Sequence, residues 1–143
     1  MKIIFDYNRT LFNPDTSSLY EGVSSVLENL SKRHDLFLVS KFEPGRQDMF
    51  KKLSIARYFQ QVAFVEKKTK ELFIDLVGAN TDVLVIGDRV KEEITIGNQL
   101  GYITVWIKQG KFADELPANQ VERPQYIISN VAEITSIISK YEK

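Results

Sequence analysis

Four short apolar segments of the chain each lead to a side chain that could take part in phosphate chemistry. The segment IIFD ends at Asp6, LFLVS ends at Ser40, FVEKK carries Lys67 and Lys68, and VLVIGD ends at Asp88. A carboxylate can act as a nucleophile and form an aspartyl-phosphate. A second carboxylate helps to hold Mg²⁺, which prefers oxygen ligands. A lysine and a hydroxyl can neutralise and orient phosphoryl oxygens, so the four groups together suit phosphoryl transfer.

Each of these residues also has an ordinary structural explanation when it is taken alone. Asp6 could be a helix N-cap, Ser40 a turn residue and Asp88 part of a turn. Lys67 and Lys68 could be solvated surface side chains. The positions of these residues along the chain favour the chemical interpretation, because each residue follows a different predicted strand. In open α/β sheets, ligands bind beyond the carboxyl ends of the strands, where these groups would meet.

The elements that must position these groups alternate along the chain. We expect strands at residues 2–5, 36–39, 62–65, 83–86, 103–107 and 126–128. We expect helices at residues 19–31 with Ser17 or Ser18 as cap, 46–53, 72–77 with a cap at Thr69 and a stop at Gly78 and Asn80, 91–100 and 131–141, with a turn at 55–59. This alternation predicts an α/β fold, a Rossmann-like three-layer α/β/α sandwich with a mainly parallel sheet.

Composition sets outer limits on the function. The 143 residues fit one domain, residues 1–143, and the formal net charge of zero gives no general attraction to nucleic acid or to a membrane. Without cysteine, disulfides and thiolate sites are excluded. The single histidine, His34, cannot build a histidine-rich zinc site, and we expect it at the surface, away from the candidate site. The apolar run at residues 3–5 is too short for a signal peptide, so we expect a cytoplasmic protein.

The four segments resemble the motifs of the haloacid dehalogenase-like (HAD) hydrolase superfamily, and the resemblance covers essentially the whole chain. The first family motif is a strand followed by Asp-x-Asp-x-Thr, and here it reads IIFDYNRTL. The others correspond to LFLVS, EKKTKELF and VLVIGDRVKEEI, and the later segment GNQLGYITVWIKQGKF is also similar to many members. The first and fourth motifs are the more specific. The resemblance implies a HAD-like fold and a Mg²⁺-dependent phosphate-ester hydrolase, or phosphatase.

The resemblance assigns roles to the first two motifs. Asp6 would be the nucleophile and a ligand of Mg²⁺. Asn8 occupies the general acid/base position, and its backbone carbonyl would also bind the metal. Thr10 would order the first loop beside the substrate. Ser40 would hydrogen-bond the phosphoryl group, with Lys41 next to it as a further substrate contact.

The last two motifs leave two choices open. Either Lys67 or Lys68 would pair with the nucleophile and the phosphate, because a cap at Thr69 suits both. Asp88 would be a metal ligand. The second acid of the fourth motif would be Glu92 or Glu93, acting on the metal directly or through its neighbours.

Two residues depart from the family pattern. Asn8 stands where the family usually has an acid, and an amide cannot transfer the proton that general acid–base catalysis requires. Because that help is worth roughly 10²–10⁴-fold, we expect a weak phosphatase. Arg9 stands where many relatives have a small residue. We expect either that Arg9 contacts an anion on the substrate or that it is a solvated surface residue.

The connections around the first two motifs are too short for the cap domain that many HAD relatives insert there. Residues 12–18 and 41–65 leave room for a helix and a turn, so we expect a capless protein with an open site. Open sites exclude water poorly and hold small substrates weakly. The substrate would be a phosphorylated small molecule or macromolecule, and a homo-oligomer could cover the site.

Three alternatives compete with this interpretation. A catalytically impaired HAD-like protein could keep the pocket and act as a phosphoryl-binding or regulatory module, which Asn8 and Arg9 favour. Dehalogenases of the family do not need the metal, so the retained Gly87-Asp88 pair with a nearby acid favours phosphate chemistry. A receiver domain would carry its phosphorylated aspartate after the third strand, where this chain has lysines.

Overall fold

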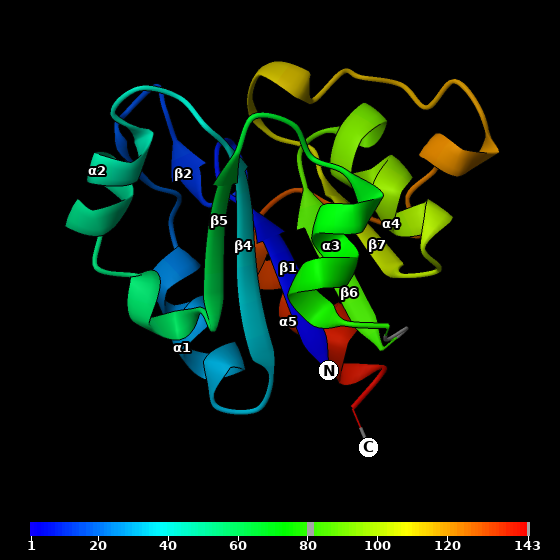
Figure 1. Cartoon of the computed structure of the whole chain (residues 1–143), viewed down its shortest axis with the longest axis horizontal. Helices are drawn as coiled ribbons and strands as arrows, with labels where there is room; N and C mark the ends of the chain where they lie inside the picture. Colours follow the sequence, from blue (N-terminus) through cyan, green and yellow to red (C-terminus); the bar gives the residue numbers. More distant parts are fainter. Residues whose placement is uncertain (80–81, 143) are drawn as a thin grey trace.

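The computed structural model describes residues 1–79 and 82–142 and shows a six-stranded sheet between two layers of helices (Figure 1). The strands lie in the order β5-β4-β1-β6-β7-β8 and every neighbouring pair is parallel. Their bounds are β1 (Lys2–Asp6), β4 (Asp35–Lys41), β5 (Gln61–Val65), β6 (Val83–Gly87), β7 (Ile103–Ile107) and β8 (Tyr126–Ile128). The predicted α/β sandwich with a parallel sheet is therefore confirmed.

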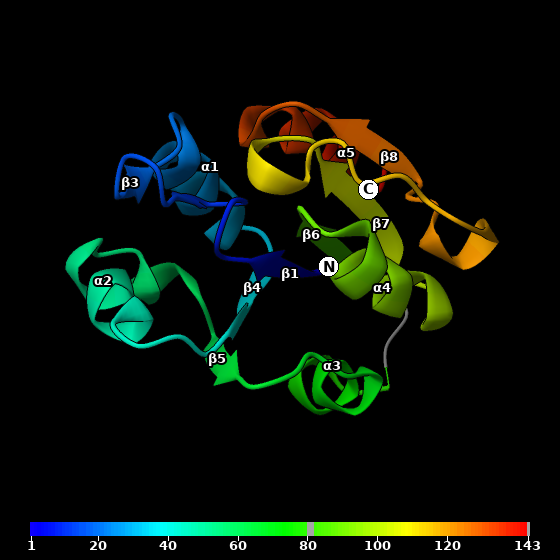
Figure 2. The same cartoon turned by 90° about the horizontal axis from the view of Figure 1, so that it is seen from above.

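The helices cover both faces of this sheet (Figure 2). One face carries α1 (Val23–Ser31) and α5 (Ile134–Ser139), and the other carries α3 (Lys70–Val77) and α4 (Thr95–Gln99). The remaining helix, α2 (Arg46–Lys52), lies beside the β5 edge. Shorter helical turns are η1 (Ala56–Tyr58), η2 (Val90–Ile94), η3 (Gly110–Phe112), η4 (Gln120–Glu122) and η5 (Val131–Glu133).

The central strand β1 is buried on both faces. Ile3 and Phe5 pack in the core cluster beneath α1 and α5, whereas Ile4 packs in the cluster beneath α3. Side chains alternate along a strand, so a strand covered on both sides needs an uninterrupted apolar run. This is why Ile3-Ile4-Phe5 forms the middle of the sheet and delivers Asp6 to its carboxyl edge.

The chain reverses direction across the sheet at β1. It first passes outward to β4 and β5, and it then returns to β6 on the other side of β1. Phe5 pairs with Ile86, so the residues that follow each of them lie next to each other at the strand ends. Ligands of open α/β sheets bind at such a reversal, which places Asp6 and Asp88 at the favoured position.

Three predicted helices differ from the structure, and the one expected at 131–141 divides into η5 and α5. The helix expected at 19–31 begins at Val23, and its cap is Gly22 with a φ of 84°, so neither Ser17 nor Ser18 caps it. The preceding residues form a short hairpin of β2 (Phe12–Asn13) and β3 (Ser18–Leu19). The helix expected at 91–100 divides into the π-helical turn η2 and α4. Asn80, expected to end a helix, lies outside the described residues.

No cap domain interrupts the described part of the chain. The connection from β1 to α1 holds only the β2–β3 hairpin, and the connection from β4 to β5 holds only α2 and η1. Among residues 1–79 and 82–142, no helix has the length and apolar character needed to span a bilayer.

His34 is partly buried and less exposed than expected, although it lies away from the candidate site as expected. Its side chain is only 7% exposed, and its Nε2 lies 2.7 Å from a carboxylate oxygen of Glu142. The amino group of Met1 lies 3.1 Å from its Nδ1. The interaction with a residue more than a hundred positions away could not be read from the local sequence.

Candidate active site

The carboxylate of Asp6 is held on both oxygens. Lys68 Nζ donates a hydrogen bond to Asp6 Oδ1 at 2.7 Å, and Thr10 Oγ1 donates to Asp6 Oδ2 at 3.0 Å. All three side chains are buried. Thr10 therefore orients Asp6, as expected for the first loop, but it does not line the pocket and makes no surface available to a substrate.

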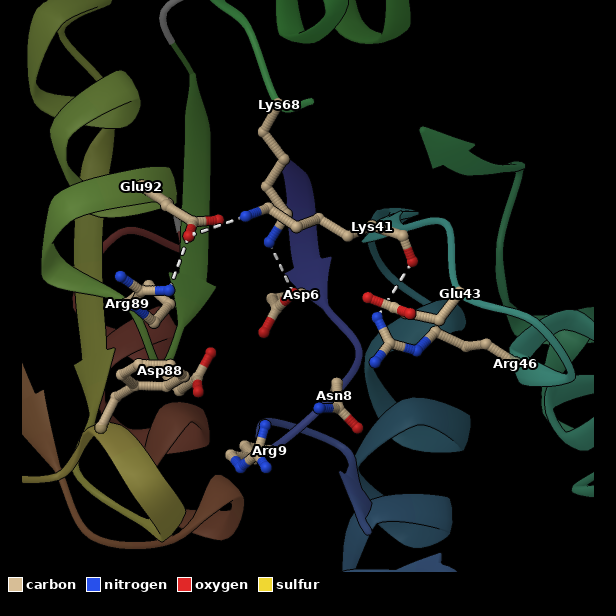
Figure 3. A pocket seen from close by; sticks show the side chains of 11 residues that line it. Asp6, Asn8, Arg9, Lys41, Glu43, Arg46, Lys68, Asp88, Arg89 and Glu92 are labelled. Carbon is tan, nitrogen blue, oxygen red and sulfur yellow. Dashed lines mark hydrogen bonds and ion pairs between the residues drawn. The ribbon is translucent and has the colours of Figure 1, made fainter. Parts of the chain in front are cut away.

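Lys68 reaches Asp6 because of where α3 begins. Thr69 is the N-cap of α3, and its side chain accepts a hydrogen bond from the backbone N–H of Leu72. The residue before the cap, Lys68, extends into the site, where Figure 3 shows its ammonium group above Asp6. Lys67 is exposed and lines a different surface depression. The structure thus brings Lys68, and not Lys67, to Asp6.

Asp88 and Glu93 complete an acidic cluster with Asp6. One carboxylate oxygen from each lies within 4.8 Å of the others, and all three residues are buried. Glu93 comes from the π-helical turn η2, and its Oε1 accepts a hydrogen bond from the backbone N–H of Arg89 at 3.3 Å. A Cβ atom at position 87 would overlap the Glu93 carboxylate, so Gly87 makes room for it.

Burial and mutual repulsion dominate the electrostatics of the cluster. Burial, with the charge of Asp6 beside it, raises the pKa of Asp88 to about 10. Burial also raises the pKa of Glu93 to about 7, against the opposing effect of Lys68. Burial alone would lower the pKa of Lys68, but Asp6 and Glu93 raise it above its ordinary value. Three carboxyl groups around one ammonium group favour a further cation or bound protons.

Glu92 takes no part in this cluster. Its carboxylate accepts hydrogen bonds from Arg89 at 2.7 Å and from Lys41 at 3.1 Å, at the edge of the pocket. Of the two glutamates expected as the second acid of the fourth motif, the structure brings Glu93 to the acidic cluster and Glu92 to the edge of the pocket. Lys41 is exposed and lines the pocket, and its expected contact with a substrate stays a prediction.

Ser40 is not placed as the sequence suggested. It lies inside β4, which is longer than predicted because Lys41 still pairs with Val65 of β5. Its side chain is buried, and its Oγ donates to the carbonyl oxygen of Lys41 at 3.2 Å. Ser40 does not line the pocket, so its expected contact with a phosphoryl group stays a prediction.

Asp6, Lys68 and Asp88 open into a pocket of about 190 Å³ (Figure 3). It is lined by Asp6, Asn8, Arg9, Lys41, Glu43, Arg46, Lys68, Asp88, Arg89, Glu92 and Phe112. No sequence pattern pointed to Arg46, Arg89 or Phe112 as residues of the pocket. Arg46 begins a helix beyond the strand ends, and Phe112 belongs to a long irregular segment whose path depends on tertiary contacts.

Asn8 lies at the edge of this pocket, between Asp6 and Arg9 in Figure 3. The preceding Tyr7 is fully buried and stacks on Phe12 with ring centroids 5.2 Å apart. Burial raises the pKa of Tyr7 to about 12, so this phenol stays neutral near neutral pH. Tyr7 therefore anchors the loop under the pocket and leaves Asn8 facing it.

A family model of HAD-hydrolase-like proteins matches residues 62–134, which is about half of the chain. The chain belongs to the HAD-like hydrolase family. The matched region contains Lys68, Asp88 and Glu93, and the structure joins them to Asp6 from outside it.

Individual proteins are similar to this chain in sequence or in fold. A glyceraldehyde 3-phosphate phosphatase from Methanopyrus kandleri is 29% identical over 101 residues, 64% of this chain and 43% of the relative. The chain thus spans less than half the length of this curated relative. D,D-heptose 1,7-bisphosphate phosphatase from Burkholderia thailandensis superimposes with a TM-score of 0.75 at 13% identity, covering 99% of both chains. YfnB from Bacillus subtilis, described as a HAD-hydrolase and bound to magnesium, gives 0.71 at 22% identity, covering 85% of this chain and 57% of YfnB.

Proposed function

We propose that this HAD-like chain is a phosphatase that hydrolyses phosphate esters through attack by Asp6. One observation carries the proposal: the last residue of the central strand shares a buried cluster with Lys68, Asp88 and Glu93. The phosphatase names of two relatives support the same class of reaction.

The donor set of the cluster fits Mg²⁺. The carboxylate oxygens of Asp6, Asp88 and Glu93 are hard ligands within 4.8 Å of one another, and the single ammonium group of Lys68 leaves them with excess negative charge. Asp6 and Asp88 would hold the ion, with Glu93 and the backbone carbonyl of Asn8 as further ligands or supports. When bound, Mg²⁺ would neutralise charge on the phosphoryl oxygens.

Hydrolysis of the ester would proceed in two displacement steps at phosphorus. A carboxylate oxygen of Asp6 attacks phosphorus, the bond from phosphorus to the ester oxygen breaks, and the alcohol leaves. Water next attacks the phosphorus of the aspartyl-phosphate, which releases phosphate and restores the carboxylate. Lys68 reduces the repulsion between Asp6 and the phosphate, and Thr10 keeps the carboxylate in one orientation.

Asn8 is the specific observation that favours a second candidate. An amide can neither protonate the leaving oxygen nor activate the water, so both proton transfers fall to solvent. A protein that keeps the pocket but turns over negligibly would be a phosphoryl-binding or regulatory module. Calorimetry separates the two candidates, because such a module binds phosphorylated ligands with Mg²⁺ and forms no product.

Several features of the whole protein stay proposals. The substrate is a phosphorylated small molecule or macromolecule, and a second copy of the chain covering the open pocket would explain how a small substrate is retained. A cytoplasmic location is consistent with the composition. Light scattering at micromolar protein concentration would test whether the chain associates with itself.

The direct test of the function is hydrolysis of p-nitrophenyl phosphate with Mg²⁺ and with EDTA. We expect turnover only with Mg²⁺, and we expect Asp6→Asn to abolish it, because the amide is not a nucleophile. Asp75→Asn, at an exposed position of α3, is the matched control and should retain full activity. Equal activity of Asp6→Asn and wild type would refute the nucleophile assignment.

A further inference from the structure

The pocket is lined by more cationic side chains than the single lysine that pairs with the cluster around Asp6. Five cationic side chains line it, and three of them are paired with carboxylates: Lys68 with Asp6 and Glu93, Lys41 with Glu92, and Arg89 with Glu92 and Glu115. The other two are Arg9 and Arg46. Within the described residues, neither has a carboxylate partner within ion-pair distance.

The backbone of Arg9 is fixed in an unusual conformation. Its φ is 61°, in the left-handed region that residues with a Cβ seldom adopt. Its N–H donates to the carbonyl oxygen of Phe12 at 2.8 Å, and its own carbonyl oxygen accepts from Gln109 Nε2 at 3.1 Å. Residues held in this region cost free energy and concentrate at functional sites.

The side chain of Arg9 is also supported along its length. The stem packs beside Gly110, where an added Cβ would lie 3.1 Å from Arg9 Cδ. The guanidinium carbon lies 5.8 Å from the ring centroid of Phe112, and the guanidinium of Arg89 lies on the same ring. Figure 3 shows Arg9 beside Asn8 and below Asp88, at the rim of the pocket.

We propose that Arg9 binds a second anionic group of the substrate. The preferred substrates are then phosphate esters that carry another phosphate or a carboxylate a few bonds from the ester that is cleaved. This inference rests on the proposed phosphatase function, and it narrows the substrate class. The planar guanidinium can donate two parallel hydrogen bonds to such a group, and a guanidinium without a carboxylate partner is free to do so.

Arg46 is a weaker choice for the same role. Its guanidinium already donates to the carbonyl oxygen of Lys41 at 3.0 Å. It also lines a second depression, whose walls include the apolar side chains of Phe12, Pro14 and Met49. An anion would meet a less polar surface there, so we assign the binding of the second anionic group to Arg9. Arg46 provides a comparison variant.

The test uses three substrates that differ at one end only. Propyl phosphate has no second anion, 1,3-propanediol bisphosphate has a phosphate there, and 3-hydroxypropanoate phosphate has a carboxylate. We expect wild type to prefer a substrate with two anionic groups by kcat/KM, and Arg9→Gln to reduce that preference by about tenfold to a hundredfold, as for loss of a charged hydrogen-bonded pair. Comparing the two substrates that carry a second anionic group shows which group Arg9 prefers.

Two control variants accompany Arg9→Gln. Arg57→Gln removes an exposed arginine that donates hydrogen bonds to Ser54 and Tyr58, and it should leave the preference as in wild type. A preference that survives in Arg9→Gln, or that is lost in Arg46→Gln instead, would overturn the inference. If Arg9→Gln fails to fold, Arg9→Lys keeps the charge without the two-pronged donor and should lower the preference.

A binding experiment separates this inference from the proposed function. Propane-1,3-bisphosphonate and propylphosphonate contain carbon–phosphorus bonds that a phosphatase does not cleave. Calorimetry with excess Mg²⁺ should show tighter binding of the bisphosphonate to wild type and loss of the difference in Arg9→Gln. If the bisphosphonate binds more tightly in this way but no ester is turned over, the role of Arg9 is supported and hydrolysis is refuted. If esters are turned over but neither binding nor kcat/KM differs between the compounds, the role of Arg9 alone is refuted.

Discussion

In the proposed mechanism, Asn8 occupies the position of the general acid and base, and its side chain is an amide of nearly the same shape as the expected acid. We predict that Asn8→Asp raises the turnover of p-nitrophenyl phosphate, because it restores a group that can exchange a proton with the leaving oxygen and the water. General acid–base catalysis sets the scale at roughly 10²–10⁴-fold, and an activated aryl ester should fall at its lower end. Initial rates at saturating Mg²⁺ measure the change.

The matched control for this variant is Asn13→Asp. Asn13 lies in the nearby β2–β3 hairpin and outside the pocket, so the same change of charge there should leave the rate unaltered. An Asn8→Asp variant that gains no activity would mean that chemistry at this position does not limit the rate.

The two neighbouring lysines should differ sharply in their effect on stability. Lys68 is buried between the carboxylates of Asp6 and Glu93, whereas Lys67 is exposed. Removing one partner of a buried ion pair costs about 3–5 kcal/mol, because the remaining charges lose their compensation. Urea denaturation should therefore show a large loss for Lys68→Gln and almost none for Lys67→Gln, and similar losses would contradict the assignment.

For the site residues, the sequence predicted the type of side chain better than its exact position in the chain. Asp6 and Asp88 could be predicted, because each follows an unambiguous apolar strand and both strands are parallel. The choice between Lys67 and Lys68 needed the direction in which the backbone enters α3. The choice between Glu92 and Glu93 needed the π-helical turn, which no local pattern indicated.

Among the elements, the junction of β6 and η2 decides where the second acid lies. Gly87 ends β6, and a methyl group there would overlap the carboxylate of Glu93. We predict that Gly87→Ala destabilises the protein by about 1–3 kcal/mol, as expected when a filled site is overpacked. Urea denaturation measures the loss.

A double-mutant cycle tests the cause of that loss. Glu93→Ala removes the group with which the added methyl would clash, so the combined variant should lose less stability than the sum of the single variants. Simple additivity would show that Gly87 is needed for another reason.

Strands with an apolar run of their own were predicted well, and the β2–β3 hairpin was not. Strands such as β1 and β6 are specified by their own apolar runs. The β2–β3 hairpin has two residues in each strand and exists because Phe12 is buried beside Leu19, which packs against the same core cluster. Leu19 fits the helical pattern equally well, so the sequence alone placed it in the following helix.

Over the whole molecule, the strand order is what converts separate motifs into one site. Alternation of strands and helices predicted the parallel sheet, and the reversal at β1 then places the first and fourth motifs together. The residues at the edge of the pocket could not be predicted to the same degree. Arg46 and Phe112 reach the pocket from connecting segments, whose conformation is set by contacts between distant parts of the chain.

The buried acids should make stability depend on pH and Mg²⁺ together. The pKa of Glu93 rises from its ordinary 4.5 to about 7, and that of Asp88 rises to about 10. Above the ordinary values the folded protein therefore binds more protons than the unfolded chain, so the free energy of unfolding falls as pH rises through this window. We predict a lower melting temperature in EDTA at pH about 7.5 than at pH about 5.5.

Added Mg²⁺ should reverse this trend, because the ion competes with the protons for the same carboxylates. The increase in melting temperature on adding Mg²⁺ should be larger at the higher pH, and Asp88→Asn should reduce it. A stability in EDTA that rises across the same window would contradict the buried-acid account.

The most direct test of the central claim is a crystal structure of the protein with Mg²⁺ and trifluoroberyllate, which mimics a phosphoryl group on a carboxylate. The account predicts beryllium bonded to a carboxylate oxygen of Asp6, one Mg²⁺ held by both Asp6 and Asp88, and Lys68 facing the fluorines. Beryllium on another side chain, or a metal ion that does not contact Asp6 and Asp88 together, would contradict it.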